Sequence, residues 1–214
     1  MSTIKLVCFD LDDTLIQQNS WVTLNGALGI TSEEDSRLYD EYATGTLSYD
    51  AWMKALLVHY KRSPNATKEY VTSILIKYEF IKGAKECIEQ LQNKGYEIAL
   101  ISGGINIVVD HVATTLGITH SFSSNTLVFD TDNNIKDIIH SGDERTAKTN
   151  YLKQLLITHD IMPHESVCIA DGANDLEMFT LTGHGITFNG SDIEHASWKI
   201  IKSLDEVLAI IEAT

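Results

Sequence analysis

The sequence predicts an α/β fold: a doubly wound, mostly parallel sheet of Rossmann type with helices on both faces, joined to a small all-helical cap. Two observations lead to this prediction. Short apolar runs alternate with longer amphipathic segments across residues 83–214. The first apolar run, at 6–9, is followed by a charged stretch at 16–82 that has helical spacing and no strand-like run. Alternation of this kind is typical of parallel strands, which need helix-length crossovers.

Composition limits the classes of partner. The chain has 214 residues, of which 43% are hydrophobic, enough for one core domain of about 100–150 residues and a smaller attachment. Thirty acidic residues against 16 basic ones give a net charge of −14, which disfavours nucleic acids and anionic membranes as partners. We see no export signal and no apolar run of about 18 residues. Together with three scattered cysteines lacking metal-binding spacing, this predicts a cytoplasmic protein with reduced core thiols.

The first elements follow from local patterns. Leu6–Phe9 is apolar throughout and predicts a short buried strand. Helices are expected around 21–28 and after Thr31, Ser48 and Thr67, because a capping hydroxyl opens each of the last three.

From Gly83 onward the elements alternate regularly. We expect a helix that ends at Gly95, a strand at 96–101, an SGG loop, a helix at 106–116, a hairpin over 125–139, a helix at 145–159, a strand at 166–170, a DGAND loop opening a helix to 181, edge-type strands at 184–188 and 198–201, and a helix at 204–211. The chain therefore divides into a core domain, 1–15 and 83–214, and a cap domain, 16–82. Inserted after the first strand, the cap should lie over the carboxyl edge of the sheet, where ligands bind in this architecture.

Three acids stand at the end of the first strand, in KLVCFDLDDTLI. Crowded carboxylates beside an apolar run are costly unless a cation or fixed donors compensate them. Asp10 and Asp12 lie two positions apart and can point to one site, whereas Asp13 is expected to begin the following turn.

Two further strands end in polar, glycine-containing loops, at Ser102-Gly103-Gly104 and at Asp171–Asp175. If the three strands are neighbours, four carboxylates meet in one pocket. Oxygen ligands without His or Cys favour Mg²⁺. The Ser102 hydroxyl, the amides of the glycines and Lys148 would supply donors to an anion, so the set predicts a phosphoryl-transfer site.

Each piece also has a structural interpretation of its own. The SGG segment alone is typical of a strand-to-helix turn, and DGAND alone is typical of a turn or a calcium-type loop. Lys148 alone is typical of a solvated helix residue, and the nearby Lys153 is a second candidate for the same role. One shared site explains all of them at three strand ends in the right order.

The motifs resemble a known family. DLDDT, Ser102 in ISGG, Lys148 and DGAND are similar to the four signature motifs of the haloacid dehalogenase superfamily, in its phosphatase branch. ISGG together with DGANDLEMF resembles phosphoserine phosphatases, and the insertion looks like a type 1 cap. The resemblance implies that Asp10 is the nucleophile and Asp12 the general acid and base. It further implies that phosphate is held by Ser102, Gly103 and Lys148, with Asn174 near it. Mg²⁺ would be bound by Asp10, Asp171 and the carbonyl of Asp12, with Asp175 either a ligand or a partner of a ligand.

The cap departs from the family pattern. Phosphoserine phosphatases hold the substrate ammonium with a Glu where this chain has Asn19, and the substrate carboxylate with an Arg where it has Lys54. Trp21 and Trp52 lie in the same region, as core residues or as a ligand platform.

We therefore expect a Mg²⁺-dependent phosphomonoester hydrolase that acts on a small phosphorylated metabolite through an aspartyl-phosphate. A phosphotransferase or phosphomutase shares the same residues. A phospho-acceptor signalling module is a third interpretation, although receiver domains lack the cap and the second acid. The sequence decides neither the substrate nor the oligomeric state.

Overall fold

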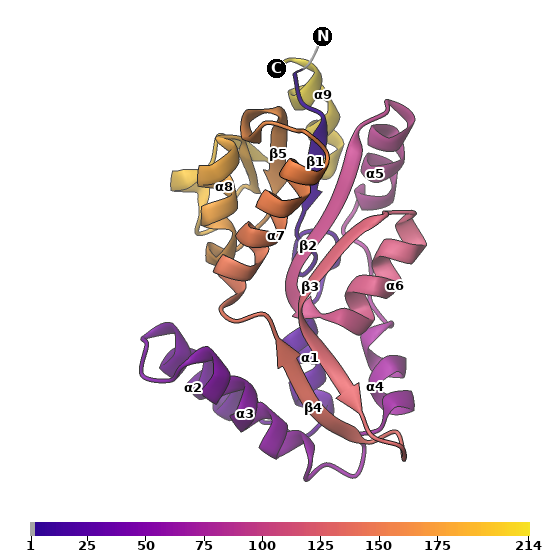
Figure 1. Ribbon diagram of the computed structural model, residues 1–214, viewed down its shortest axis with the longest axis vertical. Coiled ribbons are helices and arrows are strands. Elements are labelled where there is room, and N and C mark those ends of the chain that lie inside the picture. Colours follow the sequence, from indigo (N-terminus) through magenta and orange to yellow (C-terminus); the bar gives the residue numbers. More distant parts are fainter. Residues whose placement is uncertain (1–2) are drawn as a thin grey trace.

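A computed structural model describes residues 3–214 and shows a seven-stranded sheet in the order β4-β3-β2-β1-β5-β6-β7 (Figure 1). All neighbouring strands are parallel except β3 and β4, which form an antiparallel hairpin. The strands are β1 Leu6–Phe9, β2 Glu97–Ile105, β3 His120–Phe129, β4 Ile135–His140, β5 Ser166–Ile169, β6 Gly185–Phe188 and β7 Lys199–Ile201. This confirms the expected doubly wound α/β fold.

Nine α-helices lie within the described residues: α1 Ser20–Ala27, α2 Ser32–Ala43, α3 Tyr49–Tyr60, α4 Lys68–Leu75, α5 Ala84–Asn93, α6 Asn106–Leu116, α7 Glu144–Thr158, α8 Leu176–Thr182 and α9 Val207–Glu212. The hydroxyls of Thr31, Ser48 and Thr67 cap α2, α3 and α4, as the sequence predicted. None of the helices in residues 3–214 is both long and apolar enough to cross a membrane.

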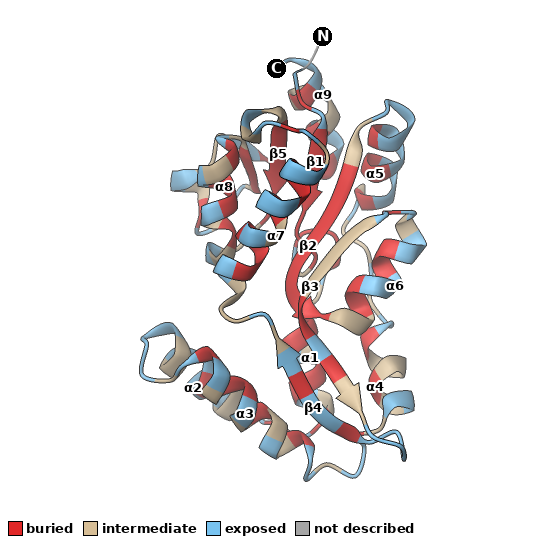
Figure 2. Cartoon of the chain, in the orientation of Figure 1, coloured by how far each residue is buried: buried red, intermediate tan, exposed pale blue. Residues whose placement is uncertain are grey.

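Strand β1 lies at the centre of the sheet and is buried on both faces (Figure 2). Leu6 and Cys8 pack into a cluster with α7 and α8, while Val7 and Phe9 pack into the larger cluster with α5, α6 and α9. Because side chains alternate along a strand, the next position on the α7 side is residue 10. The alternation of β1 thus aims Asp10 at α7.

The order of the strands reverses at β1: β2 lies on one side and β5, which follows much later in the chain, on the other. Ligands of open α/β sheets bind at such a switch point, beyond the carboxyl ends of the strands. The loops after β1, β2 and β5 therefore converge there, as expected. Cys8, Cys87 and Cys168 are buried and free.

Two details of the sheet differ from expectation. The SGG segment was expected to be a loop, but β2 continues through it to Ile105, with a register shift against β3 between Ser102 and Ile105. The continued pairing with β3 explains the extension. Strand β6 was expected at an edge but lies between β5 and β7, so of these two expected edge strands only β7 is one; β4 forms the other edge of the sheet.

The inserted helices α1–α4 leave and rejoin the sheet at neighbouring points, since Ile16 forms a bridge with Phe80 and Ile81 N–H donates to the Leu15 carbonyl. Helix α3 packs on β4, α1 on β2 and α4 on α6 (Figure 1), and Thr67, just before α4, bridges to Asn134 in the hairpin turn. The division into a core domain and a cap domain at 16–82 stays a prediction, and the hairpin extends the surface on which the inserted helices rest.

Candidate active site

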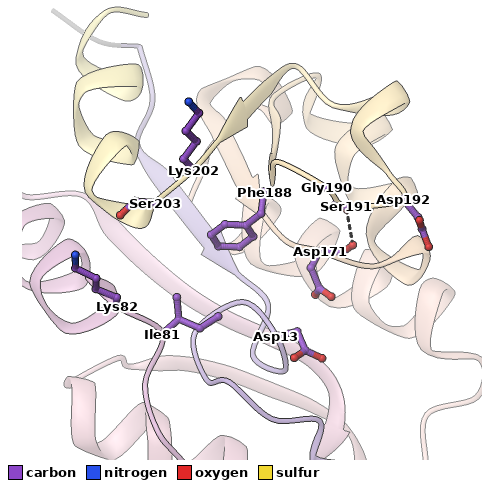
Figure 3. Close-up of a pocket in the computed structure, with 10 residues that line it drawn as sticks. All are labelled: Asp13, Ile81, Lys82, Asp171, Phe188, Gly190, Ser191, Asp192, Lys202 and Ser203. Carbon is purple, nitrogen blue, oxygen red and sulfur yellow. Dashed lines mark hydrogen bonds between the residues drawn. The ribbon is translucent and has the colours of Figure 1, made fainter.

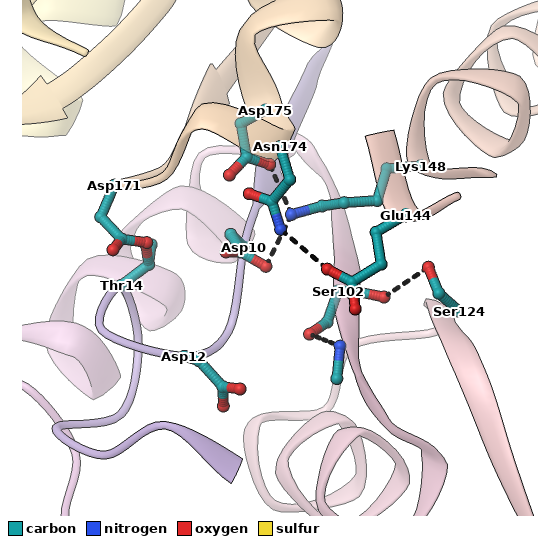
Figure 4. A network of polar contacts seen from close by, with 12 residues as sticks. Asp10, Asp12, Thr14, Ser102, Ser124, Glu144, Lys148, Asp171, Asn174 and Asp175 are labelled. Carbon is teal, nitrogen blue, oxygen red and sulfur yellow. Dashed lines mark hydrogen bonds and ion pairs between the residues drawn. The ribbon is translucent and has the colours of Figure 1, made fainter. Parts of the chain in front are cut away.

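Asp10, Lys148 and Asp175 form a buried charged network at the carboxyl end of β1 (Figure 4). The Lys148 ammonium lies 3.0 Å from Asp10 Oδ1 and 2.5 Å from Asp175 Oδ1. Lys148 and Asp175 are fully buried, and Asp10 is 6% exposed. The structure thus brings together three residues separated by up to 165 positions in the chain, and Lys148 rather than the exposed Lys153 faces the acids.

The ion pairs determine the charge of this network. Burial alone would lower the pKa of Lys148, but the charges of Asp10 and Asp175 outweigh burial and hold that pKa above its ordinary value. Burial raises the pKa of Asp175, and Lys148 opposes the rise. A buried pair of this kind is costly to break, because removing one partner leaves the other charged and desolvated.

Asp10, Asp171 and Asp175 could together hold a cation, because one carboxylate oxygen from each lies within 4.8 Å of the other two. Thr14 Oγ1 donates a hydrogen bond of 3.1 Å to Asp171 and orients it. Burial and the charges of Asp10 and Asp13 raise the pKa of Asp171 to about 7. Within residues 3–214, Asp175 Oδ2 is shielded from solvent and has no hydrogen-bond partner. A set of carboxylate oxygens with one unpaired oxygen fits a hard divalent cation such as Mg²⁺.

Asp12 lies beside this cluster and is held by Ser20. The Ser20 hydroxyl and backbone N–H donate to Asp12 Oδ2 at 2.6 and 3.0 Å. Burial raises the pKa of Asp12 to about 7, although the hydrogen bonds from Ser20 lower it. A carboxyl group with that pKa can both give and take a proton near neutral pH. Ser20 was not identified from the sequence.

The phosphate-binding loop predicted at Ser102-Gly103-Gly104 is buried next to these acids. Ser102 Oγ accepts a 2.9 Å hydrogen bond from Gly104 N–H. A Cβ atom at Gly103 would collide with the Glu144 carboxylate, and one at Gly104 would lie 2.8 Å from Ser20 Oγ. Both positions therefore need glycine for close packing.

Glu144, at the start of α7, is a further acid that the sequence did not single out. Asn174 Nδ2 donates to Glu144 Oε2 at 3.2 Å, and the Tyr49 hydroxyl donates to Oε1 at 3.1 Å. Burial raises the pKa of Glu144 to about 7, opposed by Lys148. Glu144 therefore fixes Asn174 and links the core to α3.

A cavity of about 440 Å³ connects these groups to the inserted helices. Its floor holds the motif residues, and its other wall is largely aromatic: Trp21, Tyr39, Tyr42 and Trp52. Tyr42 and Trp52 are stacked with ring centroids 4.8 Å apart, and Trp21 Nε1 donates to the Gly103 carbonyl at 3.3 Å. The two tryptophans are thus buried residues that also line the cavity.

The two cap positions singled out from the sequence are placed differently. Asn19 lines the cavity, but its Oδ1 caps α1 by accepting from the N–H groups of Trp21 and Val22. The Lys54 side chain is 72% exposed, lies 2.7 Å from Asp50 and is not among the residues lining the cavity. The cation on the cavity wall is Arg145.

A second cleft, of about 580 Å³, meets the site from the side of Asp171 and Asp13 (Figure 3). Asp13 lies in the turn after β1, as predicted, with φ +55°. Ser191 Oγ donates to the Asp171 carbonyl and holds this wall. Asp10 and Ser102 line only the first cavity, so the phosphoryl group is expected there.

Comparison with known proteins agrees with this site. A model of the haloacid dehalogenase-like hydrolase family matches residues 7–180. The phosphoserine phosphatase of Methanocaldococcus jannaschii is 28% identical over 190 residues, covering 86% of this chain and 85% of that protein. The phosphoserine phosphatase of Streptococcus thermophilus is 28% identical over 220 residues, covering 97% and 99%.

Solved structures give the same result. A phosphoserine phosphatase carrying an analogue of the phospho-aspartyl intermediate is 26% identical, with a TM-score of 0.81 and coverage of 97% of this chain and 98% of that one. A substrate-bound phosphoserine phosphatase is 25% identical, again with a TM-score of 0.81. The chain therefore belongs to the haloacid dehalogenase-like hydrolase family, in its phosphoserine phosphatase-like branch, which confirms the resemblance found in the motifs.

Proposed function

We propose that this protein is a Mg²⁺-dependent phosphatase that hydrolyses a small phosphorylated metabolite through an aspartyl-phosphate on Asp10. The observation that carries the proposal is the buried network of Asp10, Lys148 and Asp175, which reaches the floor of the cavity through Asp10, beside Asp12. The phosphatases to which the chain is similar, one of them carrying an analogue of a phospho-aspartyl intermediate, support it.

In the first half-reaction an Asp10 carboxylate oxygen attacks phosphorus, and the bond between phosphorus and the leaving oxygen breaks. Asp12, whose pKa of about 7 leaves a substantial fraction of it protonated at neutral pH, gives its proton to the leaving alkoxide. Lys148, Ser102 and the Gly103 amide surround the position of the phosphoryl oxygens. Their fixed positive charge and donors stabilise the negative charge of the transition state.

In the second half-reaction Asp12, now a carboxylate, takes a proton from water, and the water oxygen attacks phosphorus. The bond to Asp10 breaks, which releases inorganic phosphate and restores the Asp10 carboxylate. Asp10, Asp171 and Asp175, with the Asp12 carbonyl, would hold Mg²⁺, which when bound neutralises charge on the acids and the phosphoryl group. Asn174, held by Glu144, lines the same cavity and would donate to the phosphoryl group.

The first test is hydrolysis of a generic aryl phosphate. Purified protein should release phosphate with Mg²⁺ and not with EDTA, and Asp10→Asn should abolish release. Asp132→Asn, an exposed acid in the hairpin turn, is the matched control. Full activity of Asp10→Asn would exclude Asp10 as the nucleophile.

The fate of the phosphoryl group separates the alternatives. A phosphotransferase would yield a phosphorylated alcohol when an alcohol is added, whereas a hydrolase yields phosphate. A signalling module would keep its phosphoryl group for hours rather than seconds.

The leaving group should occupy the aromatic wall of the cavity. Trp52 is 5% exposed and lines the cavity, and its Nε1–H has no hydrogen-bond partner among the described residues. A buried indole N–H normally has a partner. Because Asn19 carries no charge, Lys54 lies outside and four aromatic rings line the wall, we infer a leaving group larger than serine, with a flat or apolar part and a hydrogen-bond acceptor. Asp35 and Arg145, which also line the cavity, would meet any charged groups that it carries.

A panel of phosphomonoesters tests this inference. The value of kcat/KM should be at least about tenfold higher for aryl and heterocyclic esters than for phosphoserine, a modest pocket preference. Trp52→Phe, which keeps an aromatic side chain but removes the indole N–H, should raise KM without lowering kcat. A preference for phosphoserine would overturn the inferred leaving group while leaving the phosphatase proposal intact.

A further inference from the structure

A second cluster of metal-binding side chains lies away from the catalytic acids. It consists of Glu97, His120 and His159, whose ligand atoms all lie within 4.8 Å of one another. Glu97 Oε2 lies 2.9 Å from His159 Nδ1 and 3.9 Å from His120 Nε2. Neither the motifs nor the proposed reaction uses any of the three residues.

The topology of the sheet brings these residues together. Glu97 and His120 are the first residues of the adjacent strands β2 and β3, with His120 in register with Ala99. His159 is the C-cap of α7, the helix that carries Lys148 near its other end. At 1.5 Å per residue, eleven positions separate His159 from Lys148 by about 16 Å along the helix. The cluster therefore lies at the amino edge of the sheet, opposite the active site.

The spacing of the three atoms suits a small cation. Nitrogen and oxygen ligands bind zinc at about 2.0–2.2 Å, which in tetrahedral geometry puts neighbouring ligand atoms about 3.3 Å apart. The observed 2.9 and 3.9 Å bracket that value, so small side-chain rotations suffice.

A second observation concerns Glu97 Oε2, which is shielded from solvent and has no hydrogen bond of acceptable geometry within the described residues. The 2.9 Å approach of His159 is thus a close contact without a well-aligned hydrogen bond. An enclosed carboxylate oxygen facing two imidazole nitrogens is an arrangement that a shared cation would satisfy.

We propose that Glu97, His120 and His159 form a second cation site, which binds Zn²⁺ or a similar transition-metal ion. Two imidazoles and one carboxylate favour such ions over Mg²⁺. The side chains are 26–41% exposed, which gives the ion access from solvent and leaves room for water as a further ligand. The bound ion would tie the end of α7 to the starts of β2 and β3 and so stabilise the folded protein.

The test is calorimetric titration of Zn²⁺ into the full chain with Mg²⁺ in excess, so that the catalytic acids are occupied. The protein should bind one equivalent of Zn²⁺, and its unfolding temperature should rise. His120→Ala and His159→Ala should each weaken binding at least about tenfold, since even an outer-shell partner contributes that much. His164→Ala, an exposed histidine elsewhere, should bind Zn²⁺ as the original protein does.

Two further variants keep the result interpretable. Asp171→Asn should retain the Zn²⁺ site, which separates it from the catalytic acids. Glu97→Gln keeps the side-chain shape if an alanine variant is unstable, and it should also weaken binding. The proposal would be overturned if His120→Ala and His159→Ala left the zinc affinity and the thermal stabilisation unchanged. It would also be overturned if crystals soaked in zinc gave an anomalous scattering signal at Asp10 and none at this cluster. A hydrogen-bonded Glu97–His159 pair with His120 packed edge-on is the arrangement that would then remain.

Discussion

The floor and the wall of the candidate active-site cavity consist of different kinds of residue. The floor is charged: Asp10, at the end of β1, lines it, and the fully buried Lys148 on α7 and Asp175 in the loop after β5 pair with Asp10 and with each other beneath it. The wall carries the aromatic rings, with Tyr42 stacked on Trp52, together with the charged residues Asp35 and Arg145. The floor depends on electrostatic balance, whereas the wall depends on packing. In the proposed mechanism the floor carries out the chemistry, and the wall contacts the leaving group.

The largest expected effect is that of removing the cation from the floor. Lys148→Met leaves Asp10 and Asp175 buried without their partner, which should cost about 3–5 kcal/mol of stability. Activity should fall by more than about 100-fold, because a charged group at the phosphoryl site is lost. Urea denaturation and phosphate release measure the two effects. Lys153→Met, exposed on the same helix, is the control, and a Lys148→Met variant as stable and active as the original would contradict the role of the network.

The next effect is a pH dependence of stability in the metal-free protein. Asp12, Glu144 and Asp171 have pKa values of about 7 when folded, well above the roughly 4 of unfolded carboxyl groups. The folded state therefore binds more protons than the unfolded state between about pH 4 and 7. Stability should fall as pH rises through that window and be lowest above pH 7.

Thermal unfolding in EDTA should accordingly show a lower midpoint at pH 8 than at pH 5. Mg²⁺ should raise the midpoint more at pH 8, where it meets carboxylates that have lost their protons. Asp171→Asn should flatten the dependence. A midpoint that rises from pH 5 to pH 8 in EDTA would show that these acids are not desolvated as described.

A smaller effect is expected at Ser20, which positions Asp12. Ser20→Ala removes the 2.6 Å hydrogen bond that lowers the pKa of Asp12, so that pKa should rise. The alkaline limb of kcat should move to higher pH, and kcat should fall by about tenfold, which is the range of one hydrogen bond to a charged group. Ser32→Ala, exposed at the start of α2, serves as the control. An unshifted pH profile would mean that Ser20 does not act through Asp12.

The smallest effects are expected at the margin of the wall. Lys54→Ala should change kcat/KM for any phosphomonoester by less than about twofold, because the exposed pair with Asp50 contributes little. Arg145→Ala should raise KM by about 3–10-fold for esters that carry a carboxylate, since Arg145 lines the cavity. A larger effect of Lys54→Ala than of Arg145→Ala on the same substrates would show that Lys54 contacts the substrate.

The sequence predicted the floor better than the wall for a physical reason. Asp10, Ser102 and Asp171 stand near the carboxyl ends of parallel strands, and the order of the strands fixes their meeting point. The position of Lys148 is predicted as well, because it lies one turn inside α7, the helix that precedes β5. The positions of these residues depend on local periodicity and on the order of strands and helices, and both can be predicted from the pattern of apolar residues in the sequence.

The residues that orient the floor residues by hydrogen bonds could not be predicted from the sequence in this way. Ser20 reaches Asp12 only because α1 begins where it does, and Glu144 meets Asn174 only when α7 and the loop after β5 are docked. The position of Lys54 depends on which face α3 turns toward the cavity, and its helical spacing does not decide this. The extension of β2 through Gly103 and Gly104 is set by pairing with β3, which overrides the turn tendency of glycine.

The most direct test of the central claim is to locate the phosphoryl group during turnover. The protein would be mixed with an aryl phosphate and Mg²⁺, quenched in acid within milliseconds, digested and examined by mass spectrometry, with Asp12→Asn alongside to slow hydrolysis of the intermediate. We expect one phosphoryl group, on Asp10, that disappears as substrate is exhausted. A phosphoryl group on another residue, or turnover with no phosphorylated protein in either sample, would contradict the account.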